Sequence, residues 1–307
     1  MTTFPEHNLP QTSTVSFGIK TSQTGVTYDA ILAAWREADL IPVFEHAWLW
    51  DHMVPLRGDV RTEALEAWTL LPALAAQTSR LKLGVMVTDN RLRLPTLLAK
   101  MAATVDIVSG GRLVFGIGVG ACVPRNVDPA VVAIARREFD AYGVRLVPAP
   151  EAIEALDEAL TITRRLWTES DPFDFPGRHY RLRGAIGEPK PVQRPGPPIL
   201  VGAAGERLSL RVVARHADIW NCPTRSLEEF SQKSAALDAH CRELGRDPGE
   251  IVRSMQFIVH GADPGSSRDE VMAFIQAGVR HVVLAGVGVS PAWLAAEIAE
   301  PIATALG

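Results

Sequence analysis

An acid and an imidazole stand side by side where an apolar segment of the chain ends. Asp51 and His52 follow the tryptophan-rich run 42–50, and Pro55 comes shortly after them. Histidine changes its charge between about pH 5 and 8, and a neighbouring carboxylate can orient its ring, so such a pair suits proton transfer. A surface loop pair without a role is the alternative interpretation. The elements around the pair decide between the two.

Short β-prone runs alternate with longer helical patterns along the chain, and most runs have continuous apolar centres typical of parallel strands covered on both faces. We expect strands at 15–20, 43–50, 81–87, 112–118, 197–202, 217–221, 252–260 and 281–286. We expect helices at 27–40, 62–79, 95–109, 151–168, 206–216, 226–244, 268–278 and 290–304. Eight strands, each followed by a helix, predict an α/β fold of the (β/α)8 TIM-barrel type, with a doubly wound open sheet as the alternative.

Two stretches interrupt this alternation. Residues 170–198 hold too many prolines and glycines for a regular element, and a loop of that length inside a domain is usually a lid or a binding loop. Residues 120–130 form a shorter irregular stretch after the fourth expected strand. We therefore predict one domain over residues 1–307 with an insertion around residues 170–198, and we expect both stretches to shape a substrate pocket.

In a TIM barrel the functional groups sit at the carboxyl ends of the strands, where the loops that lead into the helices gather. This rule singles out the polar and small residues that follow the expected strands: Asp51 and His52, Thr88 to Asn90, Gly120, Gly202 to Glu206, and Trp220 with Asn221. Position at a strand end favours a function for Asp51 and His52 over an incidental loop pair.

Two glycine-rich stretches have more than one interpretation. The turn at 201–210, "VGAAGERLSL", could hold a phosphate on its backbone N–H groups, or it could be an ordinary turn between a strand and a helix. Gly116, Gly118 and Gly120 alternate along one strand, so they leave room either for a flat ligand or for close packing. Neither stretch matches a dinucleotide-binding or P-loop motif.

Composition excludes several classes of protein. The chain has 307 residues, 47% of them hydrophobic and 21% charged, with a net charge of −4, which gives no reason to expect nucleic acid or an anionic membrane as a partner. The three cysteines are far apart, no metal-ligand spacing occurs among the histidines, and no window resembles a membrane span or a secretory signal. We expect a cytoplasmic protein that binds a small molecule and no metal.

Four stretches, in this order, resemble the luciferase-like flavin- and deazaflavin-dependent oxidoreductase superfamily, especially its coenzyme F420-dependent branch. They are "AWLWDH" (47–52), residues 83–120, "FDAYGV" (139–144) and residues 189–221. The resemblance implies a (β/α)8 barrel with an insertion that binds F420, or alternatively FMN, in its mouth. Members of this superfamily are commonly dimers, so a homodimer is possible.

The resemblance also implies roles for particular residues. Asp51 and His52 would lie beside the reactive ring, with His52 as the catalytic group that moves a proton. Met86 and Val87 match a bulge in strand 3 that is often built on a non-proline cis peptide behind the ring. The turn of Gly202, Ala203, Ala204 and Gly205 would hold the cofactor phosphate. Three further residues at strand ends complete the expected cofactor contacts: Thr88, Gly120 and Glu206.

One position departs from the superfamily. Many relatives carry Trp or a carboxylate where this chain has Ala121, so the general acid is unassigned: His52 could act alone, the 170–198 insertion could help, or the chemistry could be altered. We expect an oxidoreductase that transfers a hydride between F420 and a small organic substrate. The alternatives are an FMN-dependent monooxygenase, a cofactor-binding protein without turnover, and a barrel enzyme of unrelated chemistry.

Overall fold

Eight parallel strand positions close into a barrel in the computed structural model, which describes residues 14–123 and 129–307. The sheet runs in the order β3-β2-β1-β13-β12-β11-β10-β5-β4. Its strands are β1 (Ser16–Lys20), β2 (Phe44–Leu49), β3 (Lys82–Val85), β4 (Thr88–Asp89), β5 (Phe115–Gly118), β10 (Ile199–Gly202), β11 (Ile219–Asn221), β12 (Val252–His260) and β13 (His281–Val287). Each of the eight expected strands is found: β3 lies within the third, and β4 follows directly after its predicted end at residue 87.

The sheet is closed where β3 meets the segment that leads into β5. Leu83 donates its N–H to the carbonyl of Arg112 (3.0 Å) and accepts the N–H of Val114 at its own carbonyl (2.8 Å). These bonds join the two edges that a doubly wound sheet would leave open. The (β/α)8 prediction is therefore confirmed, and the open-sheet alternative is wrong.

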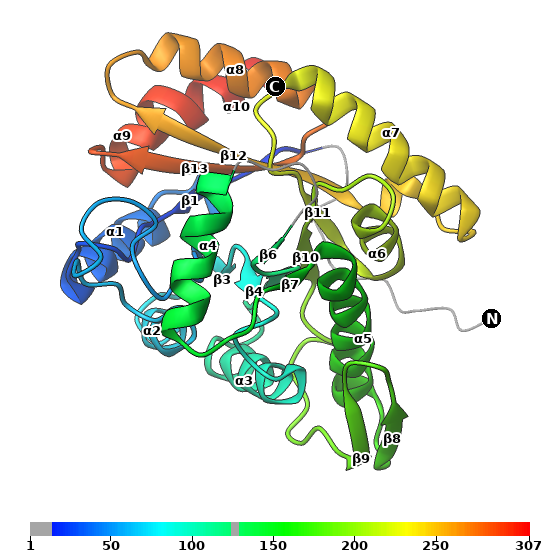
Figure 1. The fold of residues 1–307 in the computed structure, drawn as a ribbon. Coiled ribbons are helices and arrows are strands. Elements are labelled where there is room, and N and C mark those ends of the chain that lie inside the picture. Colours follow the sequence, from blue (N-terminus) through cyan, green and yellow to red (C-terminus); the bar gives the residue numbers. More distant parts are fainter. Residues whose placement is uncertain (1–13, 124–128) are drawn as a thin grey trace.

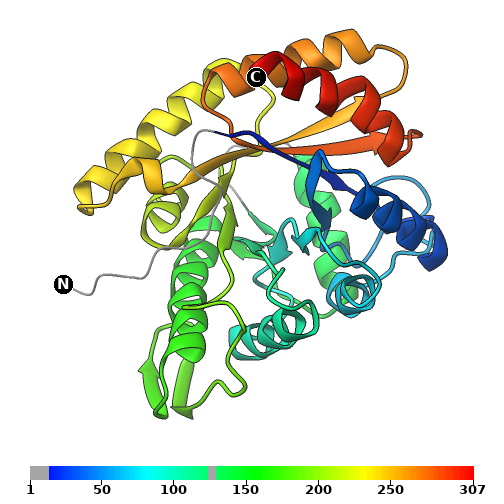
Figure 2. The same cartoon turned by 180° about the vertical axis from the view of Figure 1, so that it is seen from behind.

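Helices form an outer ring around the strands (Figures 1 and 2). They are α1 (Tyr28–Leu40), α2 (Ala67–Ala75), α3 (Pro95–Val108), α5 (Ala149–Thr168), α6 (Ser209–His216), α7 (Leu227–Glu243), α8 (Pro264–Gln276), and a C-terminal run of α9 (Pro291–Leu294), the π-helical η2 (Ala295–Ala299) and α10 (Glu300–Leu306). A single 3-10 turn, η1 (Pro248–Glu250), precedes β12. Among the described residues, no helix is long and apolar enough to cross a membrane.

Capping residues explain where two of these helices begin. Thr27 accepts the N–H of Ala30, as its position before α1 predicts. We expected α2 to begin at Thr62, but it begins at Ala67 because the carboxylate of Glu66 accepts the N–H groups of the first turn. That carboxylate also suits the positive end of the helix dipole.

The stretch at 120–130 leads into an element that the sequence analysis did not predict. The two-residue strand β6 (Cys122–Val123) pairs with β7 (Val147–Pro148), and helix α4 (Pro129–Ala141) lies between them in the chain. Residues 124–128 lie outside the described part of the chain. Figure 1 shows α4 in front of the strands, apart from the outer ring.

The prediction that residues 170–198 contain no regular element is wrong. They include an antiparallel hairpin, β8 (Phe173–Pro176) with β9 (Arg181–Ala185), which projects beside α5 in Figure 1. The carboxylate of Glu158 on α5 accepts the backbone N–H groups of all three residues 178–180 at the tip, and the guanidinium of Arg165 lies 3.8 Å from the ring centre of Phe173. These contacts to α5 order the hairpin despite its composition.

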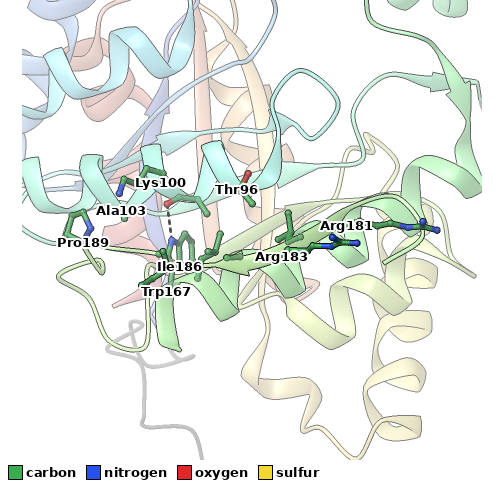
Figure 3. A pocket seen from close by; sticks show the side chains of 13 residues that line it. Thr96, Lys100, Ala103, Trp167, Arg181, Arg183, Ile186 and Pro189 are labelled. Atoms are coloured by element: carbon green, nitrogen blue, oxygen red, sulfur yellow. Dashed lines mark hydrogen bonds between the residues drawn. The ribbon is translucent and has the colours of Figure 1, made fainter. Parts of the chain in front are cut away.

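The hairpin shapes a groove on the outside of the barrel. A hollow of about 330 Å³ lies between α3, α5 and the strand β9 (Figure 3). Lys100 from α3, Trp167 from α5 and Arg183 with Ile186 from the insertion line it, and the indole N–H of Trp167 donates to the carbonyl of Ala99 (3.1 Å). The insertion therefore lies on the outside of the helical ring, against α3 and α5.

Candidate active site

The carboxyl ends of the barrel strands surround a cavity of about 1130 Å³. Lys20, Trp50, Gly118 and Asn221 come from the ends of four different strands or the residue directly after them, and Gln256 comes from the middle of β12. Helix α4 closes one side with three residues: Ile134, Ala135 and Glu138. No residue of the 170–198 insertion is part of this lining, but Tyr180 of the insertion accepts a hydrogen bond from Nδ2 of Asn90 directly after β4 (3.5 Å). The expectation that the insertion shapes a substrate pocket stays a prediction.

The residues expected to contact a cofactor gather around this one cavity, except Glu206. Those that line it are Asp51, His52, Met86, Val87, Thr88, Gly120, Gly202, Ala203, Ala204 and Gly205. Glu206 is exposed, and its carbonyl accepts a hydrogen bond from Nε2 of His240 (2.8 Å). Ser209, which the sequence analysis did not single out, lines the cavity instead.

His52 is held by a carboxylate from α4. Its Nδ1 lies 3.1 Å from Oε2 of Glu138, and the second oxygen of Glu138 accepts the backbone N–H of Met53 at 2.5 Å. An ionised carboxylate can only accept, so Nδ1 carries the hydrogen and Nε2 of the neutral ring is left as an acceptor. His52 is about one third exposed (36% of its side chain), whereas Glu138 is buried (4%).

The sequence analysis missed Glu138 because it missed α4. The residue stands one position before the "FDAYGV" stretch, and that adjacency was the one signal that could have pointed to it. Phe139 in that stretch is fully buried and anchors the helix. The preceding residue, Glu138, projects from the helix in a different direction from Phe139, towards the cavity. Its carboxylate therefore reaches the imidazole of His52.

Asp51 forms an ion pair with an arginine. Arg93 donates to both of its oxygens, at 2.7 and 2.9 Å, and the backbone N–H of Asp89 donates to Oδ2 at 2.9 Å. Arg93 also pairs with Glu66, the cap of α2. A bidentate pair of this kind is both strong and geometrically specific. Asp51 therefore ties the end of β2 to the β4 turn and to α2, although it lines the cavity.

The Met86–Val87 peptide is cis, as the resemblance implied, and it separates β3 from β4. Two glycines pack closely on Val87: a Cβ on Gly118 would lie 2.7 Å from Cγ2 of Val87, and one on Gly202 would lie 3.0 Å from Cγ1. A Cβ on Gly116 would lie 2.1 Å from the carbonyl oxygen of Val85. The alternating glycines therefore serve close packing against this strand segment.

A partly buried lysine lines the cavity. Nζ of Lys20 donates to the carbonyl of Met86 (2.9 Å) and to Oε1 of Gln256 (2.7 Å), and burial lowers the pKa of Lys20 to about 8. From Gln256 a chain of side-chain hydrogen bonds crosses the barrel interior through Asn221 and Ser254 to His281. The interior below the cavity is therefore polar along this path.

At the base of the barrel two histidines stack. The rings of His46 and His281 lie 3.9 Å apart, and Nδ1 of His46 accepts the indole N–H of Trp48 at 2.7 Å. His46 and Trp48 point inward with Trp50, as their shared strand parity predicts. Burial is the main cause of the lowered pKa of both histidines, which reaches about 3 for His281.

The turn at 202–205 offers backbone to the cavity because no side chain in it is larger than a methyl group. Two of its N–H groups already have protein acceptors: that of Ala203 donates to the carbonyl of Asn221 (3.2 Å), and that of Gly205 donates to Oγ of Ser209 (2.9 Å). Helix α6 begins at Ser209, so the positive end of its dipole lies beside the turn. This arrangement suits an anionic group.

The cavity fits a planar aromatic cofactor with a phosphate. Its volume is large for a small-molecule site, its lining is mostly apolar, and the 202–205 turn could hold the anionic group of a ligand. The buried indole N–H of Trp50 has no acceptor within residues 14–123 and 129–307, so it could donate to a ligand. Among the described residues no group of three or more His, Cys, Asp or Glu side chains could hold a metal ion.

A model of the luciferase-like monooxygenase family matches residues 13–301. The chain belongs to this family. Luciferase-like proteins with curated descriptions include a phthiodiolone/phenolphthiodiolone dimycocerosates ketoreductase of Mycobacterium bovis (strain BCG / Pasteur 1173P2), which is 32% identical over 241 residues. That match covers 77% of this chain but only 57% of the relative.

Solved structures with the same fold include an F420-dependent dehydrogenase and a monooxygenase. An F420-dependent secondary alcohol dehydrogenase in complex with an F420-acetone adduct superposes with a TM-score of 0.76 at 17% identity, covering 89% of this chain and 93% of the other. EDTA monooxygenase from Chelativorans sp. BNC1 superposes with a TM-score of 0.74 at 14% identity, covering 96% and 94%. At these identities the likeness concerns the luciferase-like barrel itself.

Proposed function

We propose that this luciferase-like protein is an oxidoreductase that transfers a hydride between coenzyme F420 and the carbonyl or alcohol carbon of a small organic substrate. The observation that carries the proposal is the His52–Glu138 pair on the rim of the cavity. A carboxylate that fixes one ring nitrogen leaves the other free to exchange a proton with a bound ligand.

Each part of the site has a task under this proposal. When bound, the deazaflavin supplies or accepts the hydride. The 202–205 turn and the N-terminus of α6 hold its phosphate, and Val87 supports its ring from the side of the cis peptide. His52 hydrogen-bonds to the ring edge through Nε2 and exchanges a proton there, while Asp51 keeps the strand end in place.

Relatives support a carbonyl substrate. The mycobacterial ketoreductase is described by the reduction of a ketone, and the F420-dependent dehydrogenase was captured with an acetone adduct. The match spans little more than half the length of the ketoreductase, so the proposal extends to the carbonyl group and not to a particular ketone. The shared chemistry is hydride transfer to a carbonyl carbon.

Titration of the purified apoprotein with F420, followed by cofactor fluorescence, tests the proposal. We expect saturable binding, and we expect the reduced cofactor to be reoxidised by at least one member of a panel of ketones and aldehydes. Absence of F420 binding at high cofactor concentration would refute the proposal. Binding without any carbonyl-dependent reoxidation would favour a cofactor-binding protein without turnover.

An FMN-dependent monooxygenase is the second candidate, because the family model is that of luciferase-like monooxygenases and the barrel superposes nearly as well on EDTA monooxygenase (TM-score 0.74) as on the F420-dependent dehydrogenase (0.76). It predicts flavin that stays with the protein during purification and oxygen uptake after the flavin is reduced. Competition between F420 and FMN for the apoprotein, measured in one titration, separates the two candidates directly.

A further inference from the structure

A third carboxyl group reaches the cavity beside Asp51 and Glu138. Asp89 ends β4, and its carboxyl is held by two backbone donors: the N–H of Arg91 to Oδ1 (2.7 Å) and the N–H of Ala121 to Oδ2 (2.9 Å). Its own N–H donates to Asp51. The carboxyl is thus fixed between the turns that follow β4 and β5, at the wall of the cavity.

The turn after β5 is shaped around this carboxyl. Gly120 has φ of +80°, and a Cβ there would lie 2.0 Å from Oδ1 of Asp89 and 2.8 Å from Cγ of Arg91. Only glycine lets the chain pass this close to the acid in that conformation. The next residue, Ala121, brings no acidic group of its own but donates its backbone N–H to Asp89.

The three carboxyl groups differ in their counter-ions. Asp51 is neutralised by Arg93, and Glu138 is paired with His52. Among the described residues no Lys, Arg or His forms an ion pair with Asp89. Titratable and charged groups face it from five elements or loops: Asp51 after β2, Arg91 after β4, Cys122 of β6, Glu138 of α4, and Tyr180 of the hairpin.

Burial and the negative neighbours make Asp89 a weaker acid than an ordinary aspartate. Burial is the larger cause, the charges of Asp51 and Glu138 add to it, and the two backbone donors oppose it, which leaves the pKa of Asp89 at about 6. A carboxyl group in this state is protonated for part of the time near neutral pH. It can therefore give a proton to a ligand and recover it from solvent.

We propose that Asp89 is the proton donor to the substrate oxygen in carbonyl reduction, and that it takes the same proton back in alcohol oxidation. This inference rests on the proposed function. In reduction a C–H bond forms at the carbonyl carbon from the hydride of the reduced deazaflavin, and the C=O π electrons move to oxygen. The O–H bond of Asp89 breaks as the new alcohol O–H forms, so the carbonyl is reduced, the deazaflavin is oxidised, and Asp89 becomes a carboxylate that water reprotonates.

This assignment separates two proton-transfer positions. His52, oriented by Glu138, serves the cofactor, and Asp89, held by Arg91 and Ala121, serves the substrate. Both groups line the same cavity but come from different strand ends. The carboxyl that Ala121 cannot supply is thereby provided from the neighbouring turn.

Direct titration of Asp89 in the apoprotein gives the first test, and it requires no cofactor. Carboxyl-¹³C-labelled aspartate is followed by NMR from pH 3 to 9 in the wild type and in Asp89→Asn. We expect one resonance with a midpoint near pH 6 that is missing from the variant. The exposed Asp59→Asn serves as the matched control and should keep that resonance. A midpoint for Asp89 in the ordinary aspartate range would overturn the inference.

Turnover by the F420-loaded protein gives the second test. Asp89→Asn should bind F420 with unchanged affinity while kcat for ketone reduction falls on the order of 10²–10⁴-fold. In the wild type kcat should decline as the pH rises above about 6, and the variant should lose that limb of the profile. Thermal melting and the F420 titration establish that the variant is folded.

The outcomes separate this inference from the proposed function. If the wild type binds no F420, or reduces no member of the carbonyl panel, the proposed function fails and the step assigned to Asp89 fails with it. If the wild type reduces a ketone but Asp89→Asn keeps its kcat and its pH profile, only the inference fails. Loss of F420 affinity in a folded variant would make Asp89 a cofactor contact and would also overturn its role as proton donor.

Discussion

Nδ1 of His52 lies 3.1 Å from Oε2 of Glu138, although 86 positions separate the two residues in the chain. The contact joins the end of β2 to α4, and the second oxygen of Glu138 binds the backbone of Met53 directly after the histidine. One carboxylate therefore fixes both the ring and the main chain that carries it. The orientation of His52 depends on an element far away in the sequence.

Replacement of His52 tests its role at the cofactor. In His52→Ala, turnover with any active substrate should fall on the order of 10²–10⁴-fold while F420 affinity is largely kept, because the proton-transfer group is lost and the phosphate site is not. Stopped-flow measurement of cofactor reoxidation checks this. An unchanged rate would remove His52 from the reaction.

Glu138→Gln tests whether the pair works as a unit. The amide keeps the size of the side chain but no longer requires a hydrogen on Nδ1, so kcat should fall by about 10–100-fold, as expected when a group that orients a functional histidine is lost. Removal of both groups should cost little more than removal of His52 alone. If the losses in the double variant were fully additive, the two residues would act independently.

The placement of the phosphate at the 202–205 turn can be tested with a matched pair. Gly205→Asp puts a negative charge beside the expected phosphate and should weaken cofactor affinity at least 10-fold, about 1.4 kcal/mol. Gly205→Ala adds a Cβ that would lie 3.0 Å from Oγ of Ser209 but adds no charge, so its effect should be smaller. Equal affinities in both variants and the wild type would locate the phosphate elsewhere.

Close packing behind the cavity makes a prediction about stability. Gly116→Ala should lower the free energy of unfolding by about 1–3 kcal/mol, because the new Cβ would lie 2.1 Å from the carbonyl oxygen of Val85. Gly265→Ala in α8 is the matched control, because its Cβ would come no nearer than 3.5 Å to Asp263. Alanine is the better helix former, so this variant should be as stable as the wild type or more stable. Urea denaturation of both variants decides, and equal stabilities would contradict the packing argument.

The stacked histidines predict a dependence of stability on pH. Burial first, and then the charge of Lys82, lowers the pKa of His281 to about 3, whereas the unfolded chain has its ordinary value of 6.5. Between pH 3 and pH 6.5 the unfolded state binds a proton at this histidine that the folded state does not bind. The free energy of unfolding is therefore unaffected by His281 above pH 6.5, and it decreases as the pH falls below that value, by up to about 1.4 kcal/mol per pH unit.

The comparison is between the wild type and His281→Asn, with urea denaturation at several pH values from 7.5 to 4.5. The wild type should lose stability more steeply than the variant as the pH falls. The raised pKa of Asp89 acts in the opposite direction, because its folded form holds the extra proton, but it does so in both proteins. Parallel curves would show that His281 does not titrate in this way.

Much of the fold was predictable because its signals are local. Continuous apolar runs fixed all eight strands, and the Pro95 start and the Gly110–Gly111 end of α3 are explained by the neighbouring residues alone. The hairpin was missed because its order comes from Glu158 and Arg165 on α5, which lie next to it only in space. The start of α2 was misplaced because two capping candidates, Thr62 and Glu66, stand close together.

The site was predictable in its positions and only partly in its partners. The strand-end rule and the resemblance named His52 and the 202–205 turn, which share the cavity. Glu138 was not named, and Asp89 was included only as part of the stretch Thr88 to Asn90, with no role of its own. Glu138 lies on a helix that the sequence analysis did not expect. Asp89 is one of several polar residues that follow β3, and only its contacts with the main chain distinguish it from the others.

Helix α4 brings Ile134, Ala135 and Glu138 to the cavity from a single element. The wall that limits the size of a ligand and the carboxylate that orients His52 therefore move together. A molecule bulky enough to displace α4 would also take Glu138 away from the imidazole. Oversized compounds would then be trapped as inhibitors rather than converted slowly, so size discrimination in this barrel should be seen in kcat as much as in affinity.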